Sequence, residues 1–331
     1  MIPRVAPQDR MFFIVGRGRS GTTLLRSILD AHPNISVAPE GLFILYLYRG
    51  YRSRALTDRT VRSLAEHVFL EARMRRWKLD SRELAARLAA IADERTFARL
   101  CAEVYEAWAD ASMKTEHRLL GDKNPHYALF AEELAELFPV ARFVHVVRDY
   151  RDNLLSYRNV PFDVASPAAL AYRWRAYNAA ILRAARRSPD RFHLLRYEDL
   201  VAQPGPTLAA LCDFLGVAPD DSVLRAHDRD HGPKLDWHRH IWRPIDAELA
   251  GQWRLRMPPD QIRLADRICQ PLGSTFGYEP ATQAGTALRD APGMALGWAM
   301  TRLERLVFRF PVWLQAMIIN SYRRLTGNMI Q

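Results

Sequence analysis

A glycine-rich loop between an expected strand and an expected helix constrains this chain more than any other feature. The apolar run 12–15 is typical of a buried strand, and it leads into 16–21, which reads Gly-Arg-Gly-Arg-Ser-Gly. Apolar residues at helical spacing then predict a helix over 22–30. Backbone N–H groups, a helix N-terminus and two arginines together form a site for phosphate or sulfate. The order strand, loop, helix therefore predicts an anion-binding α/β protein.

Two known loop types fit these residues, and a third interpretation is purely structural. Gly16, Gly18 and Gly21 satisfy the dinucleotide-binding pattern GxGxxG, and Glu40 stands near the position of the acid that binds the ribose. The same glycines followed by two threonines also resemble a P-loop in which threonine replaces the lysine. The glycines could instead serve only a tight turn, which leaves the two arginines unexplained. The loop alone does not decide between these interpretations.

A second basic motif follows the clearest expected strand, 143–147. Arg148 comes directly after this strand, and Ser156 lies eight residues further along, on the helix expected next. Helical spacing lets both side chains point into one crevice, where an arginine and a hydroxyl can bind one more phosphate. The two motifs together favour a ligand with two separate anionic groups.

Strands and helical segments alternate along the chain, which predicts a parallel sheet covered by helices on both faces. The expected strands are 12–15, 35–38, 118–120, 143–147 and 192–195. The pattern over 41–112 is helical throughout, so we expect a helical insertion there, and a helix follows at about 126–138. The aperiodic stretch 218–245 predicts a long loop of the kind that is often functional.

Composition and charge exclude several classes of protein. Apolar residues make up 49% and charged residues 25% of the 331 residues, as in ordinary globular proteins. A net charge of +10 favours an anionic partner, but the charges are spread over helices of both signs, so we expect no nucleic-acid binding. The histidines of 231–240 lack the spacing of metal ligands, so no metal is expected.

Features tied to cell compartment favour a cytoplasmic protein. The three cysteines are far apart in the sequence, which argues against a disulfide framework and favours a reducing compartment. The N-terminal apolar run is too short for a signal peptide. No stretch approaches the ~20 apolar residues that a membrane span needs.

The two motifs together resemble the nucleotide site of sulfotransferases that use 3′-phosphoadenosine-5′-phosphosulfate (PAPS). Residues 19–23, Arg-Ser-Gly-Thr-Thr, resemble the loop that holds the 5′-phosphosulfate, and Arg148 with Ser156 resembles the 3′-phosphate site. Two further stretches fit, 121–125 (Gly-Asp-Lys-Asn-Pro) and 195–200. This resemblance implies an α/β fold with a P-loop-like parallel sheet, PAPS as the donor, and no metal requirement.

The protein-tyrosine sulfotransferase branch is the most similar in motif. The similarity is carried by the loop and following helix, 19–33, and by stretches within 243–259 and 277–280. It covers roughly residues 11–280. We therefore expect a sulfotransferase domain over 1–284.

The resemblance also implies roles for individual residues. Glu40 matches the general base, Arg19 would hold the 5′-phosphosulfate, and Lys123, in an expected turn, would bring a second positive charge to the transferred group. Alternatively, Glu40 forms a structural ion pair with Arg17 or Arg19. Pro39 stands where the protein-tyrosine sulfotransferases have another acid. This difference argues against tyrosine as the acceptor more than against Glu40 as the base. The residues expected to bind the donor are Gly18, Arg19, Ser20, Gly21, Thr22, Thr23, Arg148, Ser156, Tyr197, Lys234 and Arg243.

The segment 285–331 lies beyond the resemblance and predicts an amphipathic helical extension. From Gly293 onward it carries five arginines and one glutamate, a net charge of +4, among many apolar residues. Pro311 should divide it into two helices. Packing against the chain's own core, formation of a homodimer, and peripheral contact with an anionic membrane at the inner membrane face all remain open.

The sequence thus predicts a metal-independent sulfotransferase that moves the sulfuryl group of PAPS to an acceptor hydroxyl by in-line transfer. The acceptor could be a lipid, a sugar, a phenolic metabolite or a tyrosine, because acceptor loops are the variable part of such folds. An NAD(P)-binding oxidoreductase and a P-loop-like kinase are the alternatives.

Overall fold

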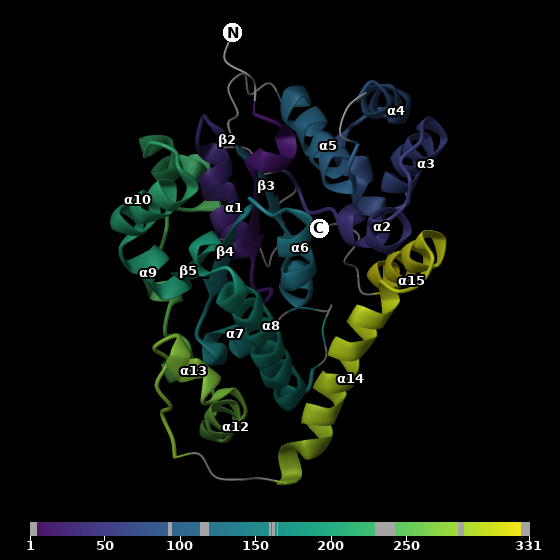
Figure 1. Cartoon of the computed structure of the whole chain (residues 1–331). Helices are drawn as coiled ribbons and strands as arrows, with labels where there is room; N and C mark the ends of the chain where they lie inside the picture. Colours follow the sequence, from purple (N-terminus) through teal and green to yellow (C-terminus); the bar gives the residue numbers. More distant parts are fainter. Residues whose placement is uncertain are drawn as a thin grey trace.

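A parallel β-sheet forms the centre of the computed structural model (Figure 1). The structure describes residues 5–91, 95–112, 119–158, 160, 163, 165–228, 242–283 and 288–325. Within these ranges the sheet has five strands in the order β2-β3-β1-β4-β5, and every neighbouring pair is parallel. The strands are β1 (Met11–Val15), β2 (Ile35–Val37), β3 (Leu119–Lys123), β4 (Arg142–Val147) and β5 (Phe192–Arg196).

Helices cover both faces of this sheet (Figure 1). The α-helices are α1 (Thr22–Ala31), α2 (Phe43–Tyr51), α3 (Asp58–Val68), α4 (Ser81–Ala89), α5 (Phe97–Ala111), α6 (Ala131–Leu137), α7 (Tyr150–Tyr157), α8 (Pro167–Arg187), α9 (Tyr197–Ala202), α10 (Pro204–Leu215), α11 (Trp253–Arg256), α12 (Pro259–Cys269), α13 (Leu272–Thr275), α14 (Ala291–Val307) and α15 (Val312–Leu325). The 3-10 helices are η1 (Pro7–Arg10), η2 (Ala72–Trp77), η3 (Pro125–Phe130), η4 (Pro189–Arg191), η5 (Asp221–Asp228), η7 (Ala247–Leu249) and η8 (Leu288–Asp290).

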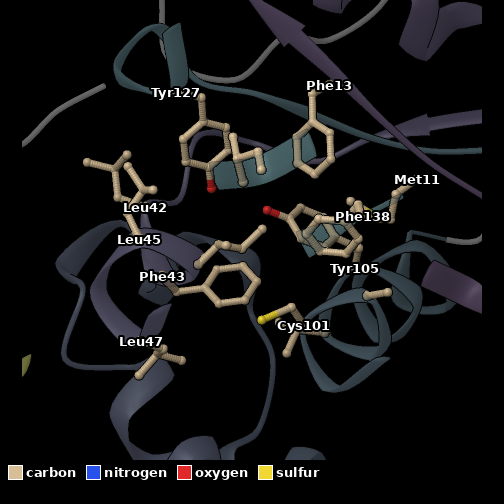
Figure 2. Packing of buried hydrophobic residues seen from close by; sticks show 14 of the residues in the cluster. Met11, Phe13, Leu42, Phe43, Leu45, Leu47, Cys101, Tyr105, Tyr127 and Phe138 are labelled. Carbon is tan, nitrogen blue, oxygen red and sulfur yellow. The ribbon is translucent and has the colours of Figure 1, made fainter. Parts of the chain in front are cut away.

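Strand β1 shows why the sheet is buried on both faces. Successive side chains of a strand point to opposite faces, and all of β1 is apolar and buried. Met11, Phe13 and Val15 pack into a cluster with α2, α5 and α6, of which Figure 2 shows Phe13 near other aromatic residues. Phe12 and Ile14 pack on the opposite face with α1 and α10. The continuous apolar run is therefore that of a central parallel strand.

The predicted strands are confirmed, with one correction that matters for the site. Strand β3 continues to Lys123, so Lys123 ends a buried strand rather than lying in a turn. Pairing with β1, where Ile14 is opposite Lys123, extends the strand beyond the short run that the local pattern indicated. The region 218–245 is also less irregular than predicted, because 221–228 forms η5. Residues 229–241 of that region lie outside the described part of the chain.

The C-terminal segment forms two helices separated at Pro311, as predicted. Helix α14 lies against α8, where Gly297 allows close contact: a Cβ there would be 2.7 Å from the carbonyl oxygen of Ala169. Helix α15 lies against α2, and Arg323 forms a buried ion pair with Glu71. The segment thus packs on the chain's own body, along one side in Figure 1.

The outer face of these two helices carries exposed apolar side chains, including Trp298 and Trp313. Membrane contact and dimer formation through this face stay predictions. None of the helices in the described ranges has the length and apolar character that crossing a membrane requires.

Candidate functional site

Two glycines shape the loop between β1 and α1. At Gly16 a Cβ would lie 2.3 Å from the carbonyl oxygen of Val146, so the loop passes directly over β4. Gly21 has a φ of 93° and is the N-cap of α1, which has no side-chain cap. The first N–H groups of a helix have no partners within it, and they attract anions. The loop therefore presents the N-terminus of α1, on which the predicted anion site depends.

Replacing Gly21 by alanine should destabilise the protein. The positive φ costs a non-glycine residue ~1–2 kcal/mol, and the new Cβ would lie 2.4 Å from the ring of Tyr197. Thermal unfolding should show a clear fall in Tm. The control is Gly50→Ala near the end of α2, where the added Cβ meets only Val312 at 3.9 Å. An unchanged Tm for Gly21→Ala would mean that the loop does not need this backbone conformation.

Arg19 lies in the loop with a left-handed backbone, φ 64°, and its Nε donates to the hydroxyl of Ser156 at 3.1 Å. Burial lowers the pKa of Arg19, and the neighbouring Arg148 guanidinium lowers it further. An anion bound between these two guanidinium groups would relieve their mutual repulsion. A strained residue at such a place is typical of a functional site.

Arg148 and Tyr197 complete this side of the loop. The Arg148 guanidinium lies over the Tyr197 ring, 4.4 Å from its centroid, and donates to the carbonyl oxygen of Leu249 at 2.7 Å. Its buried Nε has no hydrogen-bond partner among the described residues, which a ligand oxygen could provide. The structure thus brings together Arg19, Arg148, Ser156 and Tyr197, as the sequence predicts.

Asn153 holds the glycine loop in place, and the sequence analysis did not identify this residue. Its amide nitrogen donates to the carbonyl oxygen of Gly18 at 2.9 Å and to the hydroxyl of Ser20 at 3.1 Å. These bonds fix the loop to α7. Asn153 lies between Arg148 and Ser156 in the sequence, and this position within the motif could have identified it as a residue of the site.

Glu40 follows β2 on a segment that neighbouring elements hold from both sides. Arg26 of α1 donates to the carbonyl oxygens of Val37 and Ala38 at 3.2 Å. The side chain of Asn124 donates to the carbonyl oxygen of Gly41 at 3.0 Å. The backbone around Glu40 is therefore well fixed, and its carboxylate has a defined position.

Two cations contact the Glu40 carboxylate. Lys123, at the end of β3, donates to one oxygen and also to the hydroxyl of Thr23 at 3.1 Å. Arg73 of η2 donates to the other oxygen at 2.6 Å. Burial lowers the pKa of Lys123 and of Arg73, while Glu40 acts in the opposite direction on both. The structure therefore pairs Glu40 with Lys123 and Arg73, whereas the ion-pair alternative named Arg17 or Arg19.

Arg17 belongs to a second buried cluster that connects the loop to α8 and α14. It donates to Asp163 and lies between the rings of Tyr157 and Tyr177, 4.4 and 4.7 Å from their centroids. Arg173 of α8 donates to Asp163 at 2.9 Å and to Glu304 of α14 at 2.6 Å. Helix α14 is thereby linked to the glycine loop.

A cavity of about 260 Å³ is lined both by the Glu40 ion pair with Arg73 and by the cluster of Arg17, Asp163 and Arg173. Its lining combines residues of the glycine loop, Glu40 and Arg73 with residues of α14 and α15. Because the sequence analysis placed 285–331 beyond the catalytic region, it missed this second wall. No local signal in those helices indicates that they face a cavity.

Of the residues predicted to bind the donor, Gly18, Arg19, Thr22 and Thr23 line this cavity. The others in the described ranges are absent from its lining, namely Ser20, Gly21, Arg148, Ser156, Tyr197 and the exposed Arg243. Lys234 lies outside the described residues. In the described ranges, no group of three or more histidine, cysteine, aspartate or glutamate side chains could hold a metal ion.

Comparisons with known proteins agree on one family. Residues 12–221 match the family model of the sulfotransferase family. The protein-tyrosine sulfotransferase of Drosophila melanogaster is 27% identical over 285 residues, which cover 82% of this chain and 52% of the relative. Protein-tyrosine sulfotransferase 1 of Danio rerio is 25% identical over 282 residues, covering 82% and 72%. The chain thus spans about half the length of the Drosophila protein.

The solved structures agree with this result. The sulfotransferase domain of the olefin synthase from Synechococcus PCC 7002 matches with a TM-score of 0.55 and 26% identity. The match covers 81% of this chain and 95% of that domain. The parallel sheet with flanking helices is therefore shared with solved sulfotransferase domains.

Proposed function

The chain belongs to the sulfotransferase family, and on this basis we propose that it transfers the sulfuryl group of PAPS to an acceptor hydroxyl. One observation carries the proposal. The partly buried Glu40 carboxylate forms an ion pair with the buried Lys123 ammonium, and Lys123 also contacts Thr23 of the glycine loop. A proton acceptor and a cation therefore lie beside the site that would hold the transferred group.

The donor would use both basic motifs. In this proposal the N-terminus of α1 and Arg19 bind the 5′-phosphosulfate, because N–H groups and a guanidinium match the oxygens of an oxyanion. Arg148 and Ser156 bind the 3′-phosphate. The close approach of Arg19, Ser156 and Arg148 supports this assignment.

The reaction needs alignment more than covalent chemistry by the protein. The acceptor oxygen forms a bond to sulfur as the bond from sulfur to the phosphate oxygen breaks, so the products are a sulfate ester and 3′,5′-adenosine bisphosphate. Glu40 takes the hydroxyl proton, and a carboxylate beside two cations is in the form that can accept it. Lys123 and Arg19 stabilise the negative charge on the transferred group and the leaving phosphate.

Selectivity for a 3′-phosphate is the first test of this proposal. Adenosine 3′,5′-bisphosphate should raise the Tm far more than 5′-AMP, ATP or NAD, because ligands stabilise the state that binds them. Arg148→Gln and Ser156→Ala should each reduce this advantage, since a hydrogen bond to a charged group contributes ~1.5–3 kcal/mol. Arg158→Gln, an exposed site at the end of α7, is the control. Equal shifts with bisphosphate and 5′-AMP, or a larger shift with NAD, would reject PAPS as the donor.

A further inference from the structure

The lining of the cavity has two chemically different parts. The part formed by the glycine loop and Glu40 is polar, with Arg19, Thr23 and Glu40. A second part is formed by apolar side chains, and we call it the apolar chamber. Its lining side chains are Leu42, Met300, Leu303, Val307, Phe308, Ile318 and Ile319. A molecule that presents an oxygen to Glu40 would therefore extend into an apolar environment.

The charged side chains near the apolar chamber are already paired within the protein. Glu304 accepts hydrogen bonds from Arg173 and, at 2.5 Å, from the Tyr177 hydroxyl. Arg323 is paired with Glu71, and both side chains are buried. A charged acceptor entering here would have to lose its hydration without gaining a new partner of opposite charge, which is costly. An uncharged apolar group would gain free energy by leaving water.

The structure also indicates how large such a group can be. The whole cavity of about 260 Å³ lies near the lower limit of about 300 Å³ for small-molecule sites. Leu303 and Tyr322 line the cavity but are 57% and 45% exposed, so they mark its open side. A short alkyl chain or a single ring fits inside, and a longer chain would continue out past Leu303 and Tyr322.

We propose that the acceptor carries its hydroxyl on an uncharged apolar group, and that α14 and α15 bind this group in the apolar chamber. The inference rests on the proposed sulfuryl transfer, with Glu40 taking the proton. It names the substrate class of that same site. The extension 285–331 then determines acceptor specificity, while the glycine loop binds the donor.

The test is a series of acceptors of increasing alkyl length. The full chain is assayed with PAPS for release of adenosine bisphosphate, using 1-alkanols in one arm and 4-alkylphenols in the other. We expect kcat/KM to rise about threefold to fourfold per buried methylene group until the chamber is filled. Within each arm the intrinsic reactivity of the hydroxyl is constant, so the steeper rise with chain length shows whether the apolar chamber fits the aliphatic or the aromatic series better.

A matched pair of variants in α15 places this effect in the apolar chamber. Ile318→Trp puts a large ring into the chamber and should abolish the gain with chain length, while stabilisation by adenosine bisphosphate persists. Met317→Trp alters the neighbouring residue, which is 55% exposed and outside the cavity lining, and should keep the gain.

Two contrary results have different meanings. A flat series in both arms, or a higher kcat/KM for an acidic tyrosine peptide, would overturn this inference if adenosine bisphosphate still stabilises the protein. Absence of both stabilisation and transfer would overturn the proposed function and the inference with it.

Discussion

Glu40→Gln is expected to lower turnover by ~100-fold or more and to leave the affinity for adenosine bisphosphate nearly unchanged. Loss of a general base typically reduces the rate by ~10²–10⁴-fold. The amide keeps the shape of the side chain but cannot accept the proton. Steady-state kinetics give kcat, and thermal shift with adenosine bisphosphate reports donor binding.

The same substitution also removes the anion from two buried cations, so stability needs its own control. Glu106→Gln serves here, because Glu106 is buried and paired with Arg10 at 2.6 Å, and it does not line the cavity. Both variants should lose stability, since breaking a buried ion pair leaves an uncompensated charge. Only Glu40→Gln should lose turnover when both are assayed well below their Tm. If turnover of Glu40→Gln stays within a few-fold of the unmodified chain, Glu40 has a structural role alone.

Deleting residues 285–331 is expected to give aggregated or molten protein that binds no nucleotide. The deletion uncovers the apolar surface of α8 under α14. It also leaves Arg173 without Glu304, and Glu71, which is 0% exposed, without Arg323. Size-exclusion chromatography, circular dichroism and thermal shift with adenosine bisphosphate measure these outcomes.

Point variants keep this prediction testable if the deletion yields no protein. Arg323→Met leaves a buried carboxylate unpaired and should cost ~3–5 kcal/mol in denaturant unfolding. The double variant Arg323→Met with Glu71→Met should recover much of that loss, because an apolar pair can replace a buried ion pair. A truncated chain that is monomeric and as stable as the full chain would show that α14 and α15 are not part of the folded core.

The glycine loop, the strands and the two basic motifs could be predicted because local chemistry specifies them. Gly21 needs a positive φ, and Gly16 leaves no space for a Cβ against β4. Apolar runs such as 11–15 are typical of strands buried on both faces, as in a parallel sheet covered by helices. The motif with Arg148 and Ser156 lies on one strand end and one helix, so its geometry follows from helical spacing.

The partners of Glu40 and the apolar chamber were decided only by the tertiary structure. Lys123 is 83 residues from Glu40 and reaches it because β3 extends through pairing with β1. Arg323 is 252 residues from Glu71. The amphipathic sequence predicts that α14 and α15 each bury one face. It does not specify which surface this face packs against, because the burial of apolar surface is not directional. Close contacts such as Gly297 against Ala169 select the partner, and they exist only once both helices are packed.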